Sequence, residues 1–466
     1  MNATLRSLLD KMNGSIEVNA ERVRVRDEGT LRVRDIDLLA REAVFAASET
    51  RAWARWLIWE TAQTLGIRPA SIHELYVARG FERVPANFAV PAINLRALAY
   101  DSARAAFSAA IKARTGALIF ELTRNEMVDT GQRPAEYTSV VLAAAIKEGF
   151  RGPVFLQGDH FQLLAERYKK DTDAELGALR RLIDESLRAG FYNFDLATST
   201  VVDMTRSAPA EQQRRNYELT ALLTNYIRAR QPHNVIAAIG GEIGEGGQRN
   251  SDIHELRAYL DGCARTILHK PGLCKIAVMA GTAQGGAIAP DGTPIVPSVD
   301  FALLRKLSDA ARKEYGLGGV VQHGASMVPD EMFAEFARNG ALEVKLATQL
   351  QNLVLDNLPD ALRAVMRAWT LESLAGERKS GVSDEAFLHR ARRRSIGPFK
   401  EQMWALTEFE RGNIRALLER RFADLFNWLG VADTRGMAGT FVSQPEIHKS
   451  PQDFSDHPAP ITPEQE

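Results

Sequence analysis

Eight short apolar runs, spaced along the middle of the chain, constrain the fold more than any other feature. They lie at residues 90–94, 117–121, 153–157, 191–195, 235–239, 276–279, 319–322 and 342–346, and a segment long enough for a helix separates each from the next. Nearly continuous apolar strands that alternate with helices are typical of a parallel sheet buried on both faces. A TIM barrel contains eight such units in roughly 250 residues, so the pattern predicts a (β/α)8 TIM barrel, an α/β fold.

A doubly wound open sheet is the alternative architecture for alternating strands and helices. Its dinucleotide-binding members carry a Gly-x-Gly-x-x-Gly turn after the first strand. No such turn follows the run at 90–94. The number of runs and the missing turn both favour the barrel.

The sequence on either side of the barrel has a different character. Residues 1–85 predict an N-terminal helical extension, residues 86–358 the barrel, and residues 359–442 a C-terminal helical region. Residues 443–466 are rich in Pro, Ser, Asp and Glu, so we expect a disordered or surface-draped tail there. Trp53, Trp56 and Trp59 occur within the N-terminal helical pattern, and we expect them to pack that helix against the body or a second subunit.

The composition argues against several classes of protein. The chain of 466 residues has a formal net charge of −1, which gives no electrostatic reason to expect a nucleic-acid or membrane partner. No stretch approaches the roughly 20 apolar residues that span a bilayer, and the N-terminus lacks the apolar core of a signal peptide. The two cysteines, Cys263 and Cys274, have neither zinc-type nor redox-type spacing. We therefore expect a cytoplasmic protein without a disulfide framework.

Polar residues mark the ends of the predicted strands. The C-terminal ends of all strands in a TIM barrel meet at one face, where active sites form, so we expect these side chains to converge on one pocket. A single histidine at a strand end is usually a hydrogen-bonded structural group. Two histidines at matching places, with a carboxylate available, favour instead a catalytic divalent metal site with an open coordination position. The residues concerned are Asn94, Glu121, Asp159, His160, Asp195, Glu242, Gln284, His323 and Lys345.

Glycine-rich segments follow three of the strands. The segments 281–286 and 323–326 place small residues where backbone N–H groups can approach a phosphate, although glycine also serves tight turns. A helix that begins beyond Ser326 would favour an anion. These segments predict a phosphate site near the ends of the sixth and seventh strands. The third segment, 240–251, would leave Glu245 on a mobile loop, either as a proton carrier that closes over substrate or as part of a polar surface loop.

Together these segments resemble the class II, metal-dependent fructose-bisphosphate aldolase superfamily, which also contains tagatose-bisphosphate aldolases and their non-catalytic partner subunits. The resemblance runs from about Val90 to Thr348. The order and spacing of five short motifs make it specific. They are Val90-Pro-Ala-Ile-Asn94, Phe155-Leu-Gln-Gly-Asp159-His160, Phe194-Asp195-Leu-Ala-Thr-Ser199, Glu242-Ile-Gly and His323-Gly-Ala-Ser326.

The resemblance implies a role for each matching residue. His160 and His323 would bind a divalent metal ion, with Zn2+ as the expected ion, and Glu242 would join or alternate with them. Asp159 would exchange a proton with the hydroxyl of the carbon whose bond breaks, while the metal polarises the ketone and stabilises an enediolate. The resemblance also implies a sugar phosphate as the small-molecule partner and a homo-oligomer. Substrate and phosphate contacts would fall on Asn94, Gly285, Gly324, Ser326 and Thr348.

The chain departs from the family pattern in three respects. Gln284 stands where the family has another metal-binding histidine, and a neutral amide is a poor zinc ligand beside imidazole. Lys345 and Ala347 replace an asparagine and an aspartate of the eighth strand. Residues 248–249 are Gln-Arg in place of a Glu-Asp-type pair, for which Glu245 would have to compensate. The metal site would thus be weaker than usual, take a different metal, or be missing.

Lys345 is open to three interpretations. A lysine inside a barrel can have a depressed pKa and form a Schiff base with a carbonyl. It can also supply a fixed positive charge, either in place of metal charge or toward phosphate. The third interpretation is a lysine paired with Glu242 or Asp159.

The sequence therefore predicts an enzyme, an aldehyde-lyase that reversibly cleaves a phosphorylated ketose or a related sugar acid through a metal-stabilised enediolate. Epimerisation by retro-aldol cleavage and re-addition uses the same chemistry and stays open as an alternative. A second alternative, suggested by Gln284, is a non-catalytic barrel subunit that stabilises or regulates a catalytic aldolase.

Overall fold

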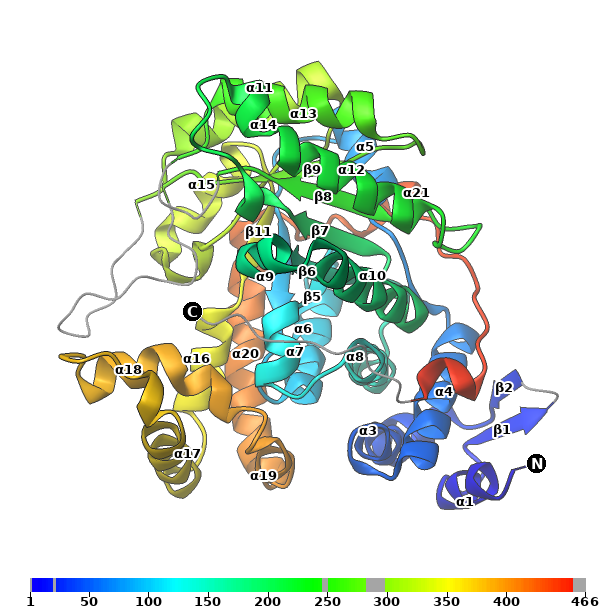
Figure 1. Ribbon diagram of the computed structural model, residues 1–466. Coiled ribbons are helices and arrows are strands. Elements are labelled where there is room, and N and C mark those ends of the chain that lie inside the picture. The colour runs from blue at the N-terminus through cyan, green and yellow to red at the C-terminus, as the bar shows by residue number, and fades with distance from the viewer. Residues whose placement is uncertain (1, 20–21, 245–249, 282–297, 456–466) are drawn as a thin grey trace.

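The computed structural model describes residues 2–19, 22–244, 250–281 and 298–455. Within these residues, eight parallel strands form a closed barrel at the centre of the molecule (Figure 1). Each strand pairs with the next along the chain, and the last pairs with the first. The predicted TIM barrel is therefore confirmed. The strands are β4 (Val90–Asn94), β5 (Ile119–Thr123), β6 (Gly152–Gln162), β7 (Asn193–Ala197), β8 (Ala238–Glu242), β9 (Lys275–Val278), β10 (Val320–Gln322) and β11 (Ala341–Leu346).

Helices follow the strands and cover the outside of the barrel (Figure 1). Several of them place an apolar stripe toward the strands, as in α10, where Leu176, Leu179, Ile183 and Leu187 are buried at helical spacing. These helices are α6 (Ala99–Lys112), α7 (Arg124–Asp129), α8 (Pro134–Glu148), α9 (Ala165–Lys170), α10 (Thr172–Ala189), α11 (Pro209–Gln212), α12 (Arg214–Arg228), α13 (Ile253–Thr266), α14 (Phe301–Tyr315), α15 (Phe333–Arg338) and α16 (Thr348–Asp356).

The segment before the barrel contains strands as well as helices. An antiparallel hairpin joins β1 to β2, and β3 pairs in parallel with the first residues of β6, so that this segment extends the barrel sheet. The sequence pattern predicts neither feature. The elements are α1 (Ala3–Lys11), β1 (Ile16–Asn19), β2 (Arg22–Val25), α2 (Glu28–Thr30), α3 (Ile36–Phe45), α4 (Ser48–Thr64), β3 (Ile67–Pro69) and α5 (His73–Gly80).

The segment after the barrel is helical and returns to its outer surface. Its longest helix, α20, packs against α6 and buries Ile414, Leu418 and Phe422. The elements are α17 (Asp360–Ser373), α18 (Asp384–Ala391), α19 (Lys400–Trp404), α20 (Glu408–Trp428) and α21 (Arg435–Phe441). No helix in the described ranges has the length and apolar character needed to cross a membrane.

Residues 443–455 lie along α4, where the red C-terminal segment meets the blue N-terminal helices in Figure 1. The indole N–H of Trp56 donates to the carbonyl of Lys449, and that of Trp59 donates to the carbonyl of Ile447, each at 2.7 Å. Both indoles are otherwise buried. The N-terminal and C-terminal parts of the chain are thus joined on one side of the barrel.

Candidate active site

A cavity opens where the C-terminal ends of the barrel strands meet. Of the residues predicted from the sequence, it brings together Asn94, Asp159, His160, His323, Gly324, Ser326, Lys345 and Thr348. Arg96, Thr123 and Ala347 complete the lining. Glu242 lies beside it, with its carboxylate 3.6 Å from Nε2 of His160. Glu245, Gln284 and Gly285 fall outside the described residues.

A bulge in β6 turns Asp159 and His160 toward the same cavity. Successive side chains of a regular strand point to opposite faces, but the pairing of β6 with β7 shifts register between Gly158 and Phe161. His160 adopts a φ of +43°, a region that residues other than glycine rarely occupy. Gly158 is needed for this geometry, because a Cβ there would lie 2.6 Å from the Phe161 ring. The bulge therefore allows two adjacent residues to serve one site.

His160, Glu242 and His323 form a group that can hold a metal ion. One ligand atom from each lies within 4.8 Å of the other two, and the two imidazole rings have their centroids 4.5 Å apart. Nε2 of His160 is buried without a hydrogen-bond partner among the described residues. Nδ1 of the same ring lies 3.3 Å from Asp159 Oδ2, an arrangement that directs Nε2 toward a metal. The donors and their spacing fit a divalent cation.

The electrostatics of this group favour a positive charge on the His160 imidazole. Burial lowers the pKa of the His160 imidazole, but the carboxylates of Asp159 and Glu242 outweigh it and raise that pKa to about 10. Burial and the neighbouring charges of His160 and Lys345 hold the pKa of His323 well below its usual value. His323 is thus neutral, the form in which imidazole binds a metal. A metal ion bound at Nε2 of His160 would take the place of that proton.

Lys345 points into a second group of acidic side chains beside the first. Its ammonium donates to Glu121 Oε2 at 2.7 Å, to Asp159 Oδ1 at 2.8 Å, and to Asp195. Burial alone would lower the pKa of Lys345, but the three carboxylates hold it well above its usual value. Among the three interpretations of Lys345, the structure bears out the pairing with Asp159; Glu242 contacts His160 and Ser199.

A second buried lysine, Lys275 of β9, lies deeper inside the barrel than Lys345. The ammonium of Lys275 bonds to Gln157 Oε1 at 2.6 Å and to Asp195 and Glu343 at 2.7 Å. Tyr76 donates to the same Glu343 at 2.6 Å. The barrel interior, which usually contains branched apolar side chains, is here a buried network of charges.

The other end of the cavity suits an anion. Gly324 and Ser326 follow β10, and α16 begins at Thr348 with its first N–H groups at the cavity wall. Ser326 Oγ accepts from the N–H of Ala347 at 2.8 Å, which fixes the turn before that helix. Helix N-termini attract anions. Two histidines that suit a cation and three residues that suit an anion (Gly324, Ser326 and Thr348) thus line the same cavity.

Comparison with known proteins places the chain in a family. The family model for class II fructose-bisphosphate aldolase matches residues 84–408, most of the chain. The chain belongs to this family. No curated protein matches it at a significant level.

Two solved structures are similar to this aldolase-family chain. One is the fructuronate-tagaturonate epimerase UxaE from Cohnella laeviribosi, with 13% identity over 93% of this chain and 90% of that chain and a TM-score of 0.53. Another is the YdjI aldolase from Escherichia coli K12, with 12% identity over 78% of this chain and 98% of that chain and a TM-score of 0.48. The likeness to the epimerase extends well beyond the barrel strands, into the terminal segments.

Sequence reasoning missed several residues of the site. Arg96 lines the cavity two positions after β4, while its guanidinium bonds to Glu126 and to Gln351. Its place just after a strand end could have identified it. Lys275 and Glu343 could have been suspected as charges within or beside apolar runs, but no sequence pattern indicates that they meet.

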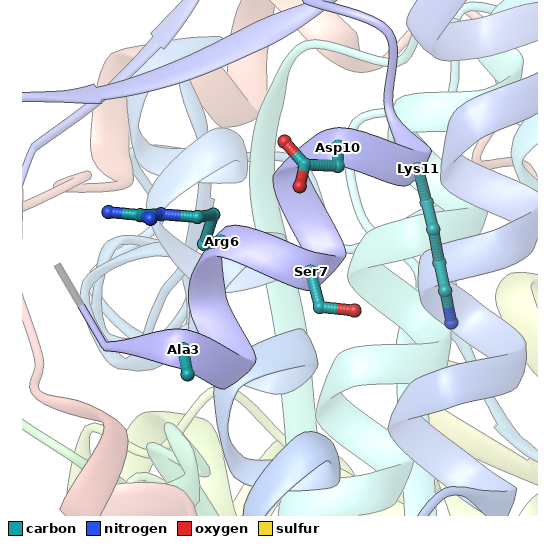
Figure 2. Close-up of a pocket in the computed structure, with 5 residues that line it drawn as sticks. All are labelled: Ala3, Arg6, Ser7, Asp10 and Lys11. Atoms are coloured by element: carbon teal, nitrogen blue, oxygen red, sulfur yellow. The ribbon is translucent and has the colours of Figure 1, made fainter.

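A shallow depression elsewhere on the surface carries no comparable group. It lies along α1 and is lined by exposed side chains, which Figure 2 shows on one side of the helix. They are Ala3, Arg6, Ser7, Asp10 and Lys11. These residues form a solvated helix face, and the candidate active site is the cavity in the barrel.

Proposed function

We propose that this protein catalyses reversible aldol-type cleavage of a carbon–carbon bond in an anionic ketose, either a phosphorylated ketose or a related sugar acid. The observation that carries the proposal is the convergence of His160, Glu242 and His323, with Asp159 beside them, at the cavity that Asp159 and the two histidines line. A divalent cation held by these three residues, Zn2+ as the expected ion, would polarise the substrate ketone and stabilise the negative charge left when the bond breaks.

Asp159 is the proposed base. Burial alone would raise the pKa of its carboxyl group, but Lys345 and His160 hold that pKa well below its usual value, so the group is ionised at neutral pH. It can therefore take the proton of the hydroxyl on the carbon that becomes the aldehyde. The electron pair of the broken bond stays on the ketone fragment, which must then gain a proton. Glu245, interpreted from the sequence as either a proton carrier or part of a polar surface loop, is outside the described residues.

Lys345 is an ammonium in this proposal and forms no Schiff base. Nucleophilic attack on a carbonyl needs a neutral amine, whereas three carboxylates surround Lys345 and keep it charged. Its role is electrostatic.

The substrate anion would bind at the opposite end of the cavity. Gly324, Ser326 and Thr348 at the start of α16 would hold a phosphate or a carboxylate, and Arg96 adds a guanidinium to the same wall. Asn94, whose amide donates to Glu126 at 2.8 Å, is placed to contact a substrate hydroxyl.

A sugar-acid epimerase is the second candidate. The fold likeness to the epimerase from Cohnella laeviribosi, over 93% of this chain, favours it. The chemistry would begin with the same cleavage; the aldehyde fragment would then turn its other face and re-add, which restores the bond with inverted configuration. The same residues would serve both reactions. The three proposed metal ligands, together with Asp159 as the proposed base, argue against a non-catalytic subunit.

Metal analysis and product analysis test the proposal together. We expect about one zinc or other divalent ion per chain after metal loading, lost in His160→Ala and in His323→Ala but retained in His254→Ala, which changes an exposed histidine of α13. Incubation with ketose phosphates and with keto sugar acids, followed by NMR, distinguishes aldehyde release from epimer formation. Unchanged metal content in His160→Ala overturns the site assignment, and no metal-dependent conversion of either class overturns the function.

A further inference from the structure

The carboxylates around Lys345 form a second cage for a cation. Glu121, Asp159 and Asp195 each direct an oxygen into a space where these atoms lie within 4.8 Å of one another, the spacing found around metal ions. All three side chains are buried. The ammonium of Lys345 fills that space and contacts all three. The chain thus supplies its own cation where a metal ion could otherwise bind.

Asp159, a member of the second group, also contacts His160 of the first group. Its Oδ1 accepts from Lys345 at 2.8 Å, and its Oδ2 faces Nδ1 of His160 at 3.3 Å. A metal ion in the second cage would take Oδ1 as a ligand and would lie next to the proposed metal of the first group. Asp159 would then bind a metal ion through Oδ1 while Oδ2 faces His160, and a carboxylate bound to a divalent ion is a poor proton acceptor.

The deeper network keeps the cage in place. Lys275 holds the second oxygen of Asp195 at 2.7 Å, and Gln157 donates to Glu121 at 2.9 Å and to Asp195 at 3.2 Å. Glu121 and Asp195 are therefore held in place by contacts that do not involve Lys345. Removing the ammonium would leave a formed set of oxygen ligands, the type that Mn2+ prefers.

We propose that Lys345 is a positioning residue whose ammonium takes the place of a second metal ion, so that the site stays mononuclear and Asp159 is reserved for proton transfer. The role assigned to Asp159 rests on the proposed function, whereas the occupancy of the cage does not. The ligand that Lys345 would keep out of the cage is a divalent cation that prefers oxygen ligands.

Metal stoichiometry tests this inference directly. Protein loaded with one equivalent of Zn2+ is titrated with Mn2+, and bound Mn2+ is counted by electron paramagnetic resonance. We expect no Mn2+ bound at sub-millimolar concentration by the natural chain, one per chain in Lys345→Ala, and none in Lys345→Ala with Glu121→Gln. Lys345→Ala should also lose activity roughly 10- to 100-fold. Added methylammonium can replace the missing positive charge, so it should displace Mn2+ from Lys345→Ala and restore part of that activity.

The matched control removes another buried cation. Arg124 bonds to Glu175 and to the Gln162 carbonyl and is as buried as Lys345; Arg124→Ala should bind no Mn2+. If Lys345→Ala does not fold alone, melting of Lys345→Asn with and without Mn2+ gives the same answer, because a ligand of the folded state raises the melting temperature.

Each outcome decides one of the two proposals. If the natural chain binds no Zn2+, the proposed metal-assisted function is wrong. Binding of Mn2+ by Lys345→Ala would in that case still support the inference about the cage. Lys345→Ala or Lys345→Asn that folds without gaining Mn2+ affinity overturns the inference while the function stands.

Discussion

Replacing Lys275 by methionine should be among the most destabilising single changes in the barrel. The lysine side chain is 0% exposed and its partner Glu343 is also 0% exposed. Methionine has a similar length, but among the described residues it leaves only Tyr76 and Gln157 as donors to the Glu343 carboxylate. Removing one member of a buried ion pair costs about 3–5 kcal/mol, because the other charge stays buried without compensation. We expect a loss of that size in the free energy of unfolding.

The double variant tests the cause of this loss. Glu343→Gln removes the charge that Lys275→Met leaves behind, while Asp195 keeps its contact with Lys345. Independent effects would sum to about 6–10 kcal/mol, whereas a shared cause should make the double variant about as stable as either single one. The expected coupling energy is at least about 2 kcal/mol.

Urea unfolding at pH 7, followed by circular dichroism, measures these differences. The exposed pair Lys313–Asp309, with side chains 61% and 45% exposed, is the control, and Lys313→Met should cost less than about 1 kcal/mol. Additive losses in the double variant, or a Lys275→Met loss no larger than that of the control, would refute the reasoning that a stranded buried charge dominates.

Three further changes test other parts of the structure. Burial, helped by Arg228, lowers the pKa of His73 to about 4 in the folded chain, whereas the imidazole of the unfolded chain has a pKa of about 6.5. Between pH 7 and pH 5 the unfolded chain therefore binds a proton that the folded chain does not, and the free energy of unfolding should fall by about 2 kcal/mol. Urea titrations at the two pH values should show this fall in the natural chain and not in His73→Gln. Gly80→Ala would place a Cβ 2.2 Å from the Gly316 carbonyl oxygen, and calorimetry should show a loss of about 1–3 kcal/mol, whereas an unchanged melting temperature contradicts the close packing. Trp59→Phe removes the donor to the Ile447 carbonyl, so we expect about 1 kcal/mol less stability and faster proteolysis within residues 443–455; equal proteolysis rates would show that the contact does not hold the segment.

The barrel could be predicted because its strands are nearly continuous apolar runs bounded by turns. The run at 90–94 coincides with β4, and the run at 342–346 differs from β11 by one residue. β5 and β7 continue two residues beyond the predicted ends at 121 and 195. The sequence pattern places Glu121 and Asp195 at strand ends, but both lie within strands and contact the lysines inside the barrel.

The strands outside the barrel pattern could not be predicted in the same way. β3 has three residues and ends at Pro69, and proline is rare in paired strands because it cannot donate to the ladder. Its pairing with Gly152 and Val154 in β6 is a tertiary contact that no local pattern encodes. The same holds for the meeting of Lys275, on the sixth barrel strand, with Glu343, on the eighth.

The adjacent pair Asp159 and His160 shows why the site itself was only partly predictable. Their residue types indicated metal and proton chemistry, yet strand alternation places neighbours on opposite faces and thus argues against a shared site. The structure resolves this conflict with the register shift after Gly158 and the left-handed backbone of His160. Such a conformation costs about 1–3 kcal/mol and persists only where surrounding contacts enforce it. Here the contacts are those of Asp159 with Lys345 and His160. The alternation of side chains along a strand therefore fails at the residues on which the proposed chemistry depends.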